Sequence, residues 1–396
     1  MRIAYICADP GIPVFGTKGA SVHVQEVIKG MLARGHEVTL FAQRLGGDAP
    51  EELKEINIKK FAKLPKTSKE ERAQTALAAN TANEEMLGKY GPFDLVYERY
   101  SLWSNVGMTF AKKHHIMGLL EVNAPLIEEQ KKHRELPLEQ EAKKIAHAVF
   151  NDADAIIAVS PGVKHYLEAF AKVGHKTHVI ANGVALDRFL PAATKNTERL
   201  SHLKQTVEQH QPVTVGFLGT LKPWHGLATL VQAWRLLREQ DHNVRLLIVG
   251  DGPEFEPLNA EINQLNLADY VTFAGAVQPE DVPQWLAQMD IAVAPYPQLE
   301  NFYFSPLKIY EYMAAALPII TTNVGHLPTV VEHNHNGILV EPENPQKMAR
   351  GILSLIKNPA KTIALGKAAR LTAEQRHSWL SVVDQILDIA HDCKER

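Results

Sequence analysis

The chain has 396 residues, which is too long for one ordinary hydrophobic core and therefore predicts two domains. Hydrophobic residues make up 45% of it and charged residues 22%, typical of a soluble globular protein, and its net charge of −3 argues against nucleic acid as the main partner. Its two cysteines, Cys7 and Cys393, stand near opposite ends, which excludes a disulfide framework and favours the cytoplasm.

The N-terminal segment MRIAYICADP is expected to form a strand rather than a signal peptide, because its apolar run is short and a turn follows at once. No stretch approaches the ~18 apolar residues that a membrane span needs. Lysine clusters such as Lys112-Lys113 are typical of solvated faces, and peripheral contact at the inner face of a membrane stays open.

Strands alternate with helices through the first half, which predicts a parallel sheet covered by helices on both faces. The expected strands are Arg2–Ala8, Glu37–Ala42, Ile56–Phe61, Phe93–Tyr97, Ile116–Val122, Ala155–Val159 and Thr177–Ile180. Helices are expected at Ala20–Arg34, Ser68–Tyr90, Leu102–His114 and Leu126–Phe150, and another opens at Pro161.

The pattern restarts after a polar stretch, residues 191–211, that predicts a linker. Strands are expected at Val213–Leu218, Arg245–Val249, Val271–Phe273, Ile291–Ala294, Ile319–Thr322 and Gly337–Val340. The helices are Leu227–Glu239, Glu254–Asn266, Val282–Gln288, Pro306–Ala316 and Pro345–Ile356. We therefore predict two doubly wound α/β domains, residues 1–190 and 212–377, and a last amphipathic helix within 378–396. Because such sheets bind ligands at the carboxyl ends of their strands, the default site is a cleft between the domains.

The stretch FYFSPLKIYEYMAAALPIITT predicts an anion site at a helix N-terminus. Ser305 suits the N-cap and Pro306 the first helical position, which leaves the N–H groups of Leu307 and Lys308 free at the positive end of the helix dipole. Lys308 adds a mobile charge, and Glu311 follows one turn later on the same face. This pattern suits a nucleoside diphosphate, with the carboxylate accepting from ribose hydroxyls. A capped helix with a surface Lys–Glu pair is the alternative.

Glycine-rich loops follow other strands and predict further ligand contacts. The loop Gly16-Thr17-Lys18-Gly19 lets a phosphate or sugar approach the backbone, unless it is only a flexible connector. Residues 219–226 place Lys222 and His225 at another helix N-terminus, where cations would neutralise a departing diphosphate. The alternative is that Trp224 is a packing anchor and that His225 only caps the helix. The chain has no GxGxxG loop, Walker loop or metal-ligand spacing, which weighs against a dinucleotide oxidoreductase.

Taken together, these segments resemble the retaining glycosyltransferases of family 4, which have the GT-B fold of two Rossmann-like domains. The matching pieces are RGHEVTLFA, IIAVSPGV, NGV, VGFLGTLKPWHG, LLIVGDGP, VTFAGAV and SPLKIYEYMAAALPIITT, in the family's order and spacing over nearly the whole chain. The resemblance implies that residues 1–190 bind an acceptor, that residues 212–377 bind a nucleotide sugar, and that the last helix crosses back to the first domain. It implies that Glu311 binds the ribose and that the Val277 backbone contacts the base. It also implies that the diphosphate is bound by Ser305, Pro306 and Leu307.

The chain departs from the family at four places. Tyr303 replaces a glutamate that contacts the donor sugar, and Thr220 and His225 replace the arginine and lysine of the phosphate loop. Lys222 and Lys308 are expected to supply the missing charge. Asn123 replaces a first-domain histidine, so the donor phosphate, not a side-chain base, is expected to deprotonate the acceptor.

We therefore predict transfer of a sugar from a nucleoside diphosphate sugar to an acceptor hydroxyl with retention, in glycan, glycolipid or polysaccharide biosynthesis, without a metal or other cofactor. The predicted catalytic residues are Lys222, His225, Lys308 and Asn123. The donor is expected to contact Gly16, Gly219, Lys222, Gly250, Val277, Tyr303, Ser305, Pro306, Leu307, Lys308 and Glu311, and the acceptor side Thr17, Lys18 and Gly19. The alternatives are a non-catalytic paralogue that binds a nucleotide sugar or a partner enzyme, and an epimerase or phosphorylase on the same fold.

Overall fold

The computed structural model describes residues 1–189, 205, 211–240, 243–299, 302–303 and 305–394. It divides into two compact units, which are described separately. Unit 1 comprises Met1–Gly183, Tyr303 and Ser305, and the C-terminal segment from Trp379 onward; unit 2 comprises the described residues of Val184–Phe302 and Pro306–Ser378. The first segment of unit 1 thus ends at Gly183 rather than at residue 190. The expected linker, residues 191–211, lies outside the described residues except for positions 205 and 211.

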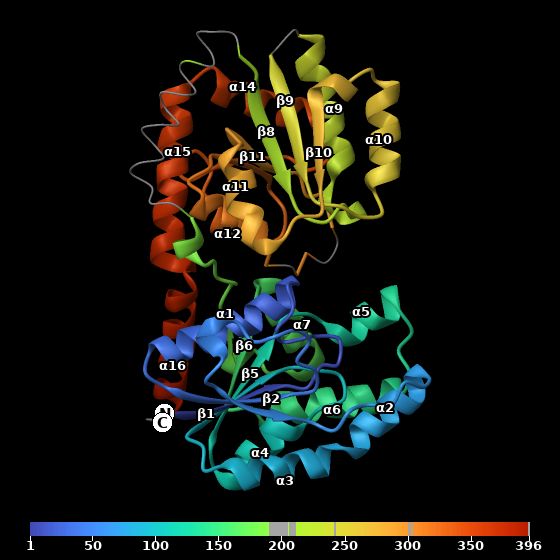
Figure 1. Ribbon diagram of the computed structural model, residues 1–396, viewed down its shortest axis with the longest axis vertical. Helices are drawn as coiled ribbons and strands as arrows, with labels where there is room; N and C mark the ends of the chain where they lie inside the picture. The colour runs from blue at the N-terminus through green and yellow to red at the C-terminus, as the bar shows by residue number, and fades with distance from the viewer. Residues whose placement is uncertain (190–204, 206–210, 241–242, 300–301, 304, 395–396) are drawn as a thin grey trace. The chain divides into compact units, whose positions relative to one another are not determined.

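Unit 1 is built on a parallel sheet with the strand order β3-β2-β1-β4-β5-β6-β7 (Figure 1). Its strands are β1 Arg2–Cys7, β2 Glu37–Ala42, β3 Asn57–Lys60, β4 Leu95–Arg99, β5 Met117–Val122, β6 Ala155–Ala158 and β7 Thr177–Val179. Tyr5 of the internal strand β1 lies opposite Leu40 of β2 on one side and Tyr97 of β4 on the other. All six residues of β5 are buried, as expected of a parallel strand covered on both faces.

Helices cover both faces of this sheet. They are α1 Gly19–Ala33, α2 Lys69–Ala78, α3 Asn80–Tyr90, α4 Val106–His114, α5 Leu126–His133, α6 Glu139–Asp152, α7 Pro161–Ala171 and α16 Trp379–Lys394. α1 and α16 pack side by side, and α16 also contacts β5 and β6, whereas α4 and α6 contact each other and β5 (Figure 1). The last helix is therefore an integral layer of unit 1.

Two helices predicted as continuous are each divided. The predicted helix Ser68–Tyr90 separates into α2 and α3 at Asn80, whose side-chain amide donates to the Leu77 carbonyl oxygen at 3.1 Å and to the Trp103 carbonyl oxygen at 2.9 Å. The predicted helix Leu126–Phe150 separates into α5 and α6, because Pro137 cannot continue a helix and Leu138 has a left-handed φ of 51°. Both corrections come from local chemistry.

Unit 2 contains a second parallel sheet, with the order β10-β9-β8-β11-β12-β13. Its strands are β8 Val213–Leu218, β9 Val244–Val249, β10 Val271–Gly275, β11 Ile291–Ala294, β12 Ile319–Thr322 and β13 Ile338–Val340. Its helices are α9 Leu227–Glu239, α10 Phe255–Gln264, α11 Val282–Ala287, α12 Leu307–Ala314, α13 Leu327–Val330, α14 Pro345–Ile356 and α15 Pro359–Thr372. Trp234 is fully buried in the core under α9. The two sheets confirm the predicted fold class of two doubly wound α/β units.

Candidate active site

In unit 2, the loops that follow β8, β9 and β10 are bonded to one another at the carboxyl edge of the sheet. The Gly219 N–H donates to the Val249 carbonyl oxygen at 2.9 Å, and the Gly250 N–H donates to the Gly275 carbonyl oxygen at 2.8 Å. Gly219 and Gly250 have φ angles of 138° and 137°, which side chains rarely adopt. A Cβ on Gly250 would also lie 2.0 Å from the Gly219 carbonyl oxygen. These glycines therefore permit the close approach of the loops.

The helix α12 begins one residue later than predicted. Pro306 is its N-cap, and no side chain caps the helix, so the assignment of Ser305 as N-cap is wrong. The Ser305 hydroxyl instead accepts the Asn182 N–H at 3.0 Å, within unit 1. Among the described residues, the N–H groups of Leu307 and Lys308 have no acceptor, so they stay available to an anion.

Lys308 on the first turn of α12 carries a buried ammonium group. The side chain is 7% exposed, and its Nζ lies 4.1 Å from the ring centroid of Phe217 and 5.3 Å from that of Tyr296. No hydrogen-bond partner for Nζ exists among the described residues. Burial lowers the pKa of Lys308 to about 7, although Glu311 opposes the shift. Lys308 is therefore a confined cation without a partner, not the mobile charge that the sequence suggested.

Glu311 follows Lys308 on the same helix and is electrostatically coupled to it. Burial raises the pKa of Glu311, while Arg188 and Lys308 lower it in part. The Lys308 Nζ also lies close to the glycine loop, since a Cβ on Gly219 would be 2.7 Å from it. The structure thus brings together Gly219, Gly250, Lys308 and Glu311.

His225 lies in the same group of side chains but is not a cation. Its Nδ1 donates to the Thr220 carbonyl oxygen, and its ring contacts those of Phe217 and Tyr296. Burial, followed by the charge of Lys308, lowers the pKa of His225 to about 3. This low pKa opposes the expectation that a protonated His225 stabilises a departing diphosphate, and that role stays a prediction.

Lys222 and Val277 lie on loops at this same edge of the sheet. Lys222 is partly exposed, its Nζ is 5.7 Å from the Trp224 ring centroid, and its charge contributes to the low pKa of His225. Val277 is two residues beyond β10 and partly exposed. Pro306 is the N-cap of α12 and Leu307 its first residue, whereas Glu311 lies in its second turn.

Tyr303 and Ser305, also assigned to the donor, belong to unit 1. The Tyr303 hydroxyl donates to Glu129, and the Tyr303 carbonyl oxygen accepts from the Ser160 hydroxyl at 2.7 Å. Burial and the neighbouring Glu129 raise the pKa of Tyr303 above its usual range. Tyr303 and Ser305, which precede α12, are thus anchored to unit 1, which the sequence did not predict.

The glycine loop before α1 is also in unit 1. Thr17, Lys18 and Gly19 are exposed, Lys18 is the N-cap of α1 without a side-chain cap, and the Gly16 carbonyl oxygen accepts from the Gln25 side chain at 2.9 Å. These contacts fix the position of the loop. Gly16 was assigned to the donor and the other three to the acceptor side.

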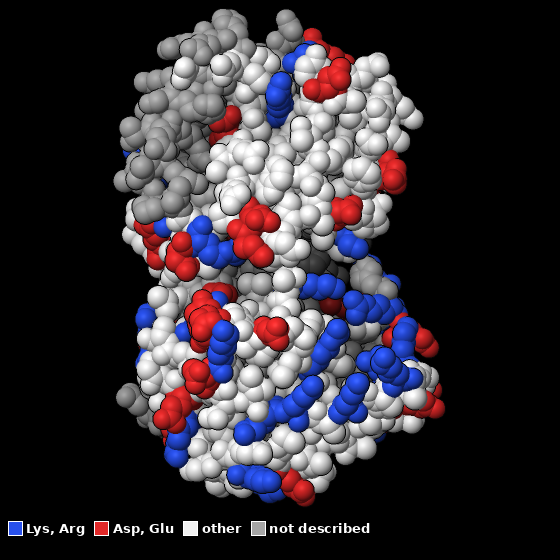
Figure 2. Space-filling model, in the orientation of Figure 1, with Lys and Arg blue, Asp and Glu red and all other residues white. Residues whose placement is uncertain are grey.

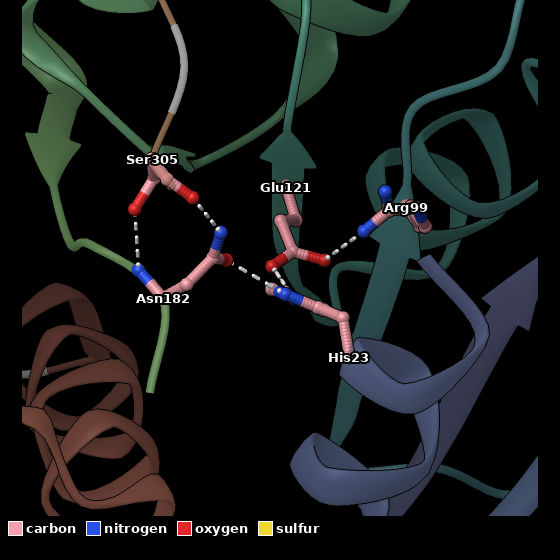
Figure 3. A network of polar contacts seen from close by, with 5 residues as sticks. All are labelled: His23, Arg99, Glu121, Asn182 and Ser305. Carbon is pink, nitrogen blue, oxygen red and sulfur yellow. Dashed lines mark hydrogen bonds and ion pairs between the residues drawn. The ribbon is translucent and has the colours of Figure 1, made fainter. Parts of the chain in front are cut away.

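Two residues before Asn123, near the end of β5, Glu121 belongs to a buried polar network that the sequence did not reveal (Figure 3). One carboxylate oxygen of Glu121 faces the Nε2 of His23, and the other lies 3.5 Å from an Arg99 nitrogen, while Asn123 contributes to lowering the pKa of Glu121. Burial alone would raise the pKa of Glu121, but His23 and Arg99 lower it to about 2. One signal was present: Glu121 interrupts the apolar strand MGLLEV.

His23 connects this network to the chain around residue 182. Its Nε2 faces Glu121, and its Nδ1 lies 2.8 Å from the Asn182 side-chain oxygen, while the Asn182 amide donates to the Ser305 carbonyl oxygen at 2.9 Å (Figure 3). Both ring nitrogens of His23 therefore face side-chain oxygens. His23 is 5% exposed, so the network is a buried charge cluster within unit 1.

Within the described ranges, no group of three or more His, Cys, Asp or Glu side chains is placed to hold a metal ion. In the same ranges, no helix has the length and apolar character needed to cross a membrane.

Comparison with known proteins gives consistent matches over the whole chain. Residues 17–188 match the family described as Glycosyltransferase Family 4, and residues 212–358 match Glycosyl transferases group 1. The spore coat protein SA of Bacillus subtilis (strain 168) is 26% identical, with 98% of this chain and 99% of that protein covered. A D-inositol 3-phosphate glycosyltransferase of Jonesia denitrificans is 26% identical, with coverages of 96% and 93%.

Solved structures show the same fold at low sequence identity. Sucrose-phosphate synthase from Thermosynechococcus elongatus superposes with a TM-score of 0.72 at 20% identity, covering 100% of this chain and 99% of that one. The Anabaena protein HepE, solved in complex with UDP and glucose, superposes with a TM-score of 0.70 at 23% identity, with coverages of 99% and 100%.

Proposed function

Since the chain belongs to the group 1, family 4 glycosyltransferases and has their GT-B fold, we propose that it moves a sugar from a nucleoside diphosphate sugar to an acceptor hydroxyl with retention. The observation that carries the donor assignment is the buried ammonium of Lys308, which has no hydrogen-bond partner among the described residues. An ammonium held in this way is costly unless an anion joins it. The adjacent free amides of α12 make a diphosphate the fitting anion.

In this proposal the leaving diphosphate is stabilised by Lys308, by Lys222, and by the amides of Leu307 and Lys308. Groups aimed at developing charge contribute roughly 3–4 kcal/mol each in enzymes where one was removed. These groups supply the positive charge, so the proposal assigns no step to a metal. Glu311 accepts from the ribose hydroxyls, the Val277 backbone contacts the base, and neutral His225 has a packing role.

The acceptor hydroxyl oxygen forms a bond to the anomeric carbon as the bond from that carbon to the diphosphate breaks. The acceptor proton passes to an oxygen of the departing diphosphate, on the face that the leaving group occupied. Asn123 supports this assignment, because an amide at that position cannot act as a general base. Unit 1 would hold the acceptor, with the loop of residues 16–19 beside it.

The names of similar proteins support the donor and acceptor classes. HepE was solved with UDP-glucose as well as with UDP, and one relative is named a glycosyltransferase of D-inositol 3-phosphate. We propose a cytoplasmic location because neither Cys7 nor Cys393 forms a disulfide within the described residues. We also propose peripheral contact with the inner face of a membrane, because Lys and Arg side chains gather on unit 1 (Figure 2).

The substitution Lys308→Ala tests the donor site. We expect kcat with an accepted donor to fall at least tenfold and UDP or GDP affinity to fall as well, with the fold retained. Lys367→Ala, which removes an exposed ammonium from α15, is the matched control and should match the wild type. Turnover that is unchanged in Lys308→Ala would refute the assignment. Binding of a nucleotide sugar without turnover on any acceptor would favour a non-catalytic paralogue.

A further inference from the structure

Unit 1 contains a cavity of about 370 Å³ at the carboxyl ends of three neighbouring strands, β2, β1 and β4. The segments that line it follow those strands directly: Ala8–Gly11, Gln43 and Arg44, and Ser101–Ser104. In a doubly wound sheet this is the edge at which ligands bind. The proposed function gave no role to these residues, so the cavity needs its own explanation.

One face of α2 forms a wall of this cavity. Lys69, Arg72, Ala73 and Ala76 all line it, and their spacing of three, four and seven residues places them on one side of the helix. The two alanines leave room inside, while the lysine and the arginine bring positive charge to the opening. Asn83, on α3, continues the wall with a buried amide.

The charges of the lining are unequal. Four cationic side chains, Arg44, Lys69, Arg72 and Arg134, meet only two acidic ones, Asp9 and Glu135. Both acids are already engaged: the Glu135 carboxylate lies 3.3 Å from Lys69 Nζ, and the Asp9 carboxylate accepts the Gly11 N–H at 2.7 Å.

The three arginines differ from Lys69, which pairs with Glu135, because their guanidinium groups have no ion pair and no hydrogen bond within the described part of the chain. Figure 2 shows Lys and Arg side chains gathered on the face of unit 1 near α2 and α5. This concentration contrasts with the chain's net charge of −3. The cavity therefore presents unpaired guanidinium groups to whatever enters it.

We propose that this cavity binds a phosphate group carried by the acceptor, so that the acceptor is a phosphorylated sugar or polyol, free or as a lipid headgroup. Guanidinium groups match phosphate oxygens with two parallel hydrogen bonds, which makes arginine the side chain suited to such a group. Trp103, a partly buried residue of the lining, offers an apolar surface for a sugar ring. This inference rests on the proposed function, because it takes the bound molecule to be the acceptor.

Calorimetric titration of the full chain with glucose 6-phosphate and with myo-inositol 1-phosphate tests the proposal. We expect binding of at least one of them, and at least tenfold weaker binding of glucose and myo-inositol. Arg72→Gln and Arg134→Gln, both exposed positions, should each weaken the phosphate compound at least tenfold. Arg350→Gln, which removes an exposed guanidinium from α14 of unit 2, should leave it unchanged.

Co-sedimentation with vesicles distinguishes the two sources of phosphate. If the acceptor is a lipid headgroup, phosphatidylinositol vesicles should bind the protein, phosphatidylcholine vesicles should not, and Arg72→Gln should reduce the binding. If the acceptor is free, only the soluble phosphates bind. The proposal is overturned if neither source binds, or if Arg350→Gln weakens binding as much as Arg72→Gln does.

Titration of the same samples with UDP and GDP separates this inference from the proposed function. Nucleotide binding without binding of any phosphorylated probe would overturn the inference and leave the donor site intact. Arginine-dependent binding of a phosphorylated probe without nucleotide binding would instead refute the donor site.

Discussion

A single residue, Lys308, shows how a side chain can weaken the fold and still serve binding. Burial lowers its pKa to about 7 from the 10.5 of a free lysine, so the unfolded chain binds one more proton between those two values. Stability therefore rises with pH across that window and is lowest, on account of this group, below pH 7. A bound diphosphate would reverse the penalty by giving the ammonium a partner.

The first residue-scale prediction concerns pH. Above pH 7 free Lys308 is largely neutral and must take up a proton to pair with a diphosphate, so UDP affinity should fall as pH rises, by up to about tenfold per unit. Two other groups do not titrate in this range: the last phosphate proton of UDP is lost near pH 6, and His225, with a pKa of about 3, is neutral throughout. Calorimetry between pH 7 and 9 measures the slope. Lys308→Ala should flatten it, whereas Glu311→Gln should retain a downward trend; a level wild-type profile would contradict the prediction.

A second prediction concerns backbone conformation. Gly250→Ala combines a φ of 137° with a contact of 2.0 Å to the Gly219 carbonyl oxygen, so we expect it to destabilise unit 2 by at least about 3 kcal/mol and to abolish UDP binding. Gly35→Ala is the control, because its φ of 75° is positive but nothing lies within 4 Å of the new Cβ. It should cost about 1–2 kcal/mol. Urea unfolding measures both changes, and equal losses would show that the contact is unimportant.

At the scale of elements, hydrophobic periodicity located the sheets and most helices, but it could not locate their ends. The hydrophobic periodicity continues across residue 79, so it does not reveal that α2 ends beside Asn80. Ser305 was wrongly assigned as an N-cap because its hydroxyl accepts a hydrogen bond from a distant residue, Asn182. The helix Pro359–Thr372 was not predicted, since its alanines, glycine and scattered lysines give a weak apolar stripe. Such features depend on partners that a local pattern does not contain.

The attachment of α16 to α1 gives a prediction at this scale. Val383 is fully buried, and its Cγ2 would lie 2.5 Å from a Cβ placed on Gly30. Asp384 and Arg34 form an ion pair with two contacts of 2.5 and 2.6 Å, and their side chains are 45% and 37% exposed, respectively. Val383→Ala should cost about 2 kcal/mol, from two buried methyl groups and a cavity. Asp384→Asn should cost under about 1 kcal/mol, and less still at high salt. Chemical denaturation compares them; a larger loss for Asp384→Asn would show that charge, not packing, attaches the helix.

At the scale of the whole molecule, the order and spacing of motifs predicted the fold class, but not that Tyr303 and Ser305 belong to unit 1. Gly219, Gly250, Lys308 and Glu311 are brought together because they follow parallel strands of one sheet or start a helix beside it. Tyr303 lies only five residues before Lys308, yet it belongs to the other unit. The cavity arginines at positions 44, 72 and 134 are too far apart in sequence for any motif to join them.

Unit 1 is assembled from three separated stretches of chain, and one of them follows the whole of unit 2 in the sequence. A ribosome that has made residues 1–378 has supplied the sequence of unit 2, while the faces of α1, β5 and β6 that α16 covers are still bare. The unit that comes second in the sequence is thus the first for which every segment has been made. A nascent chain stalled before residue 379 would present those uncovered apolar faces to chaperones.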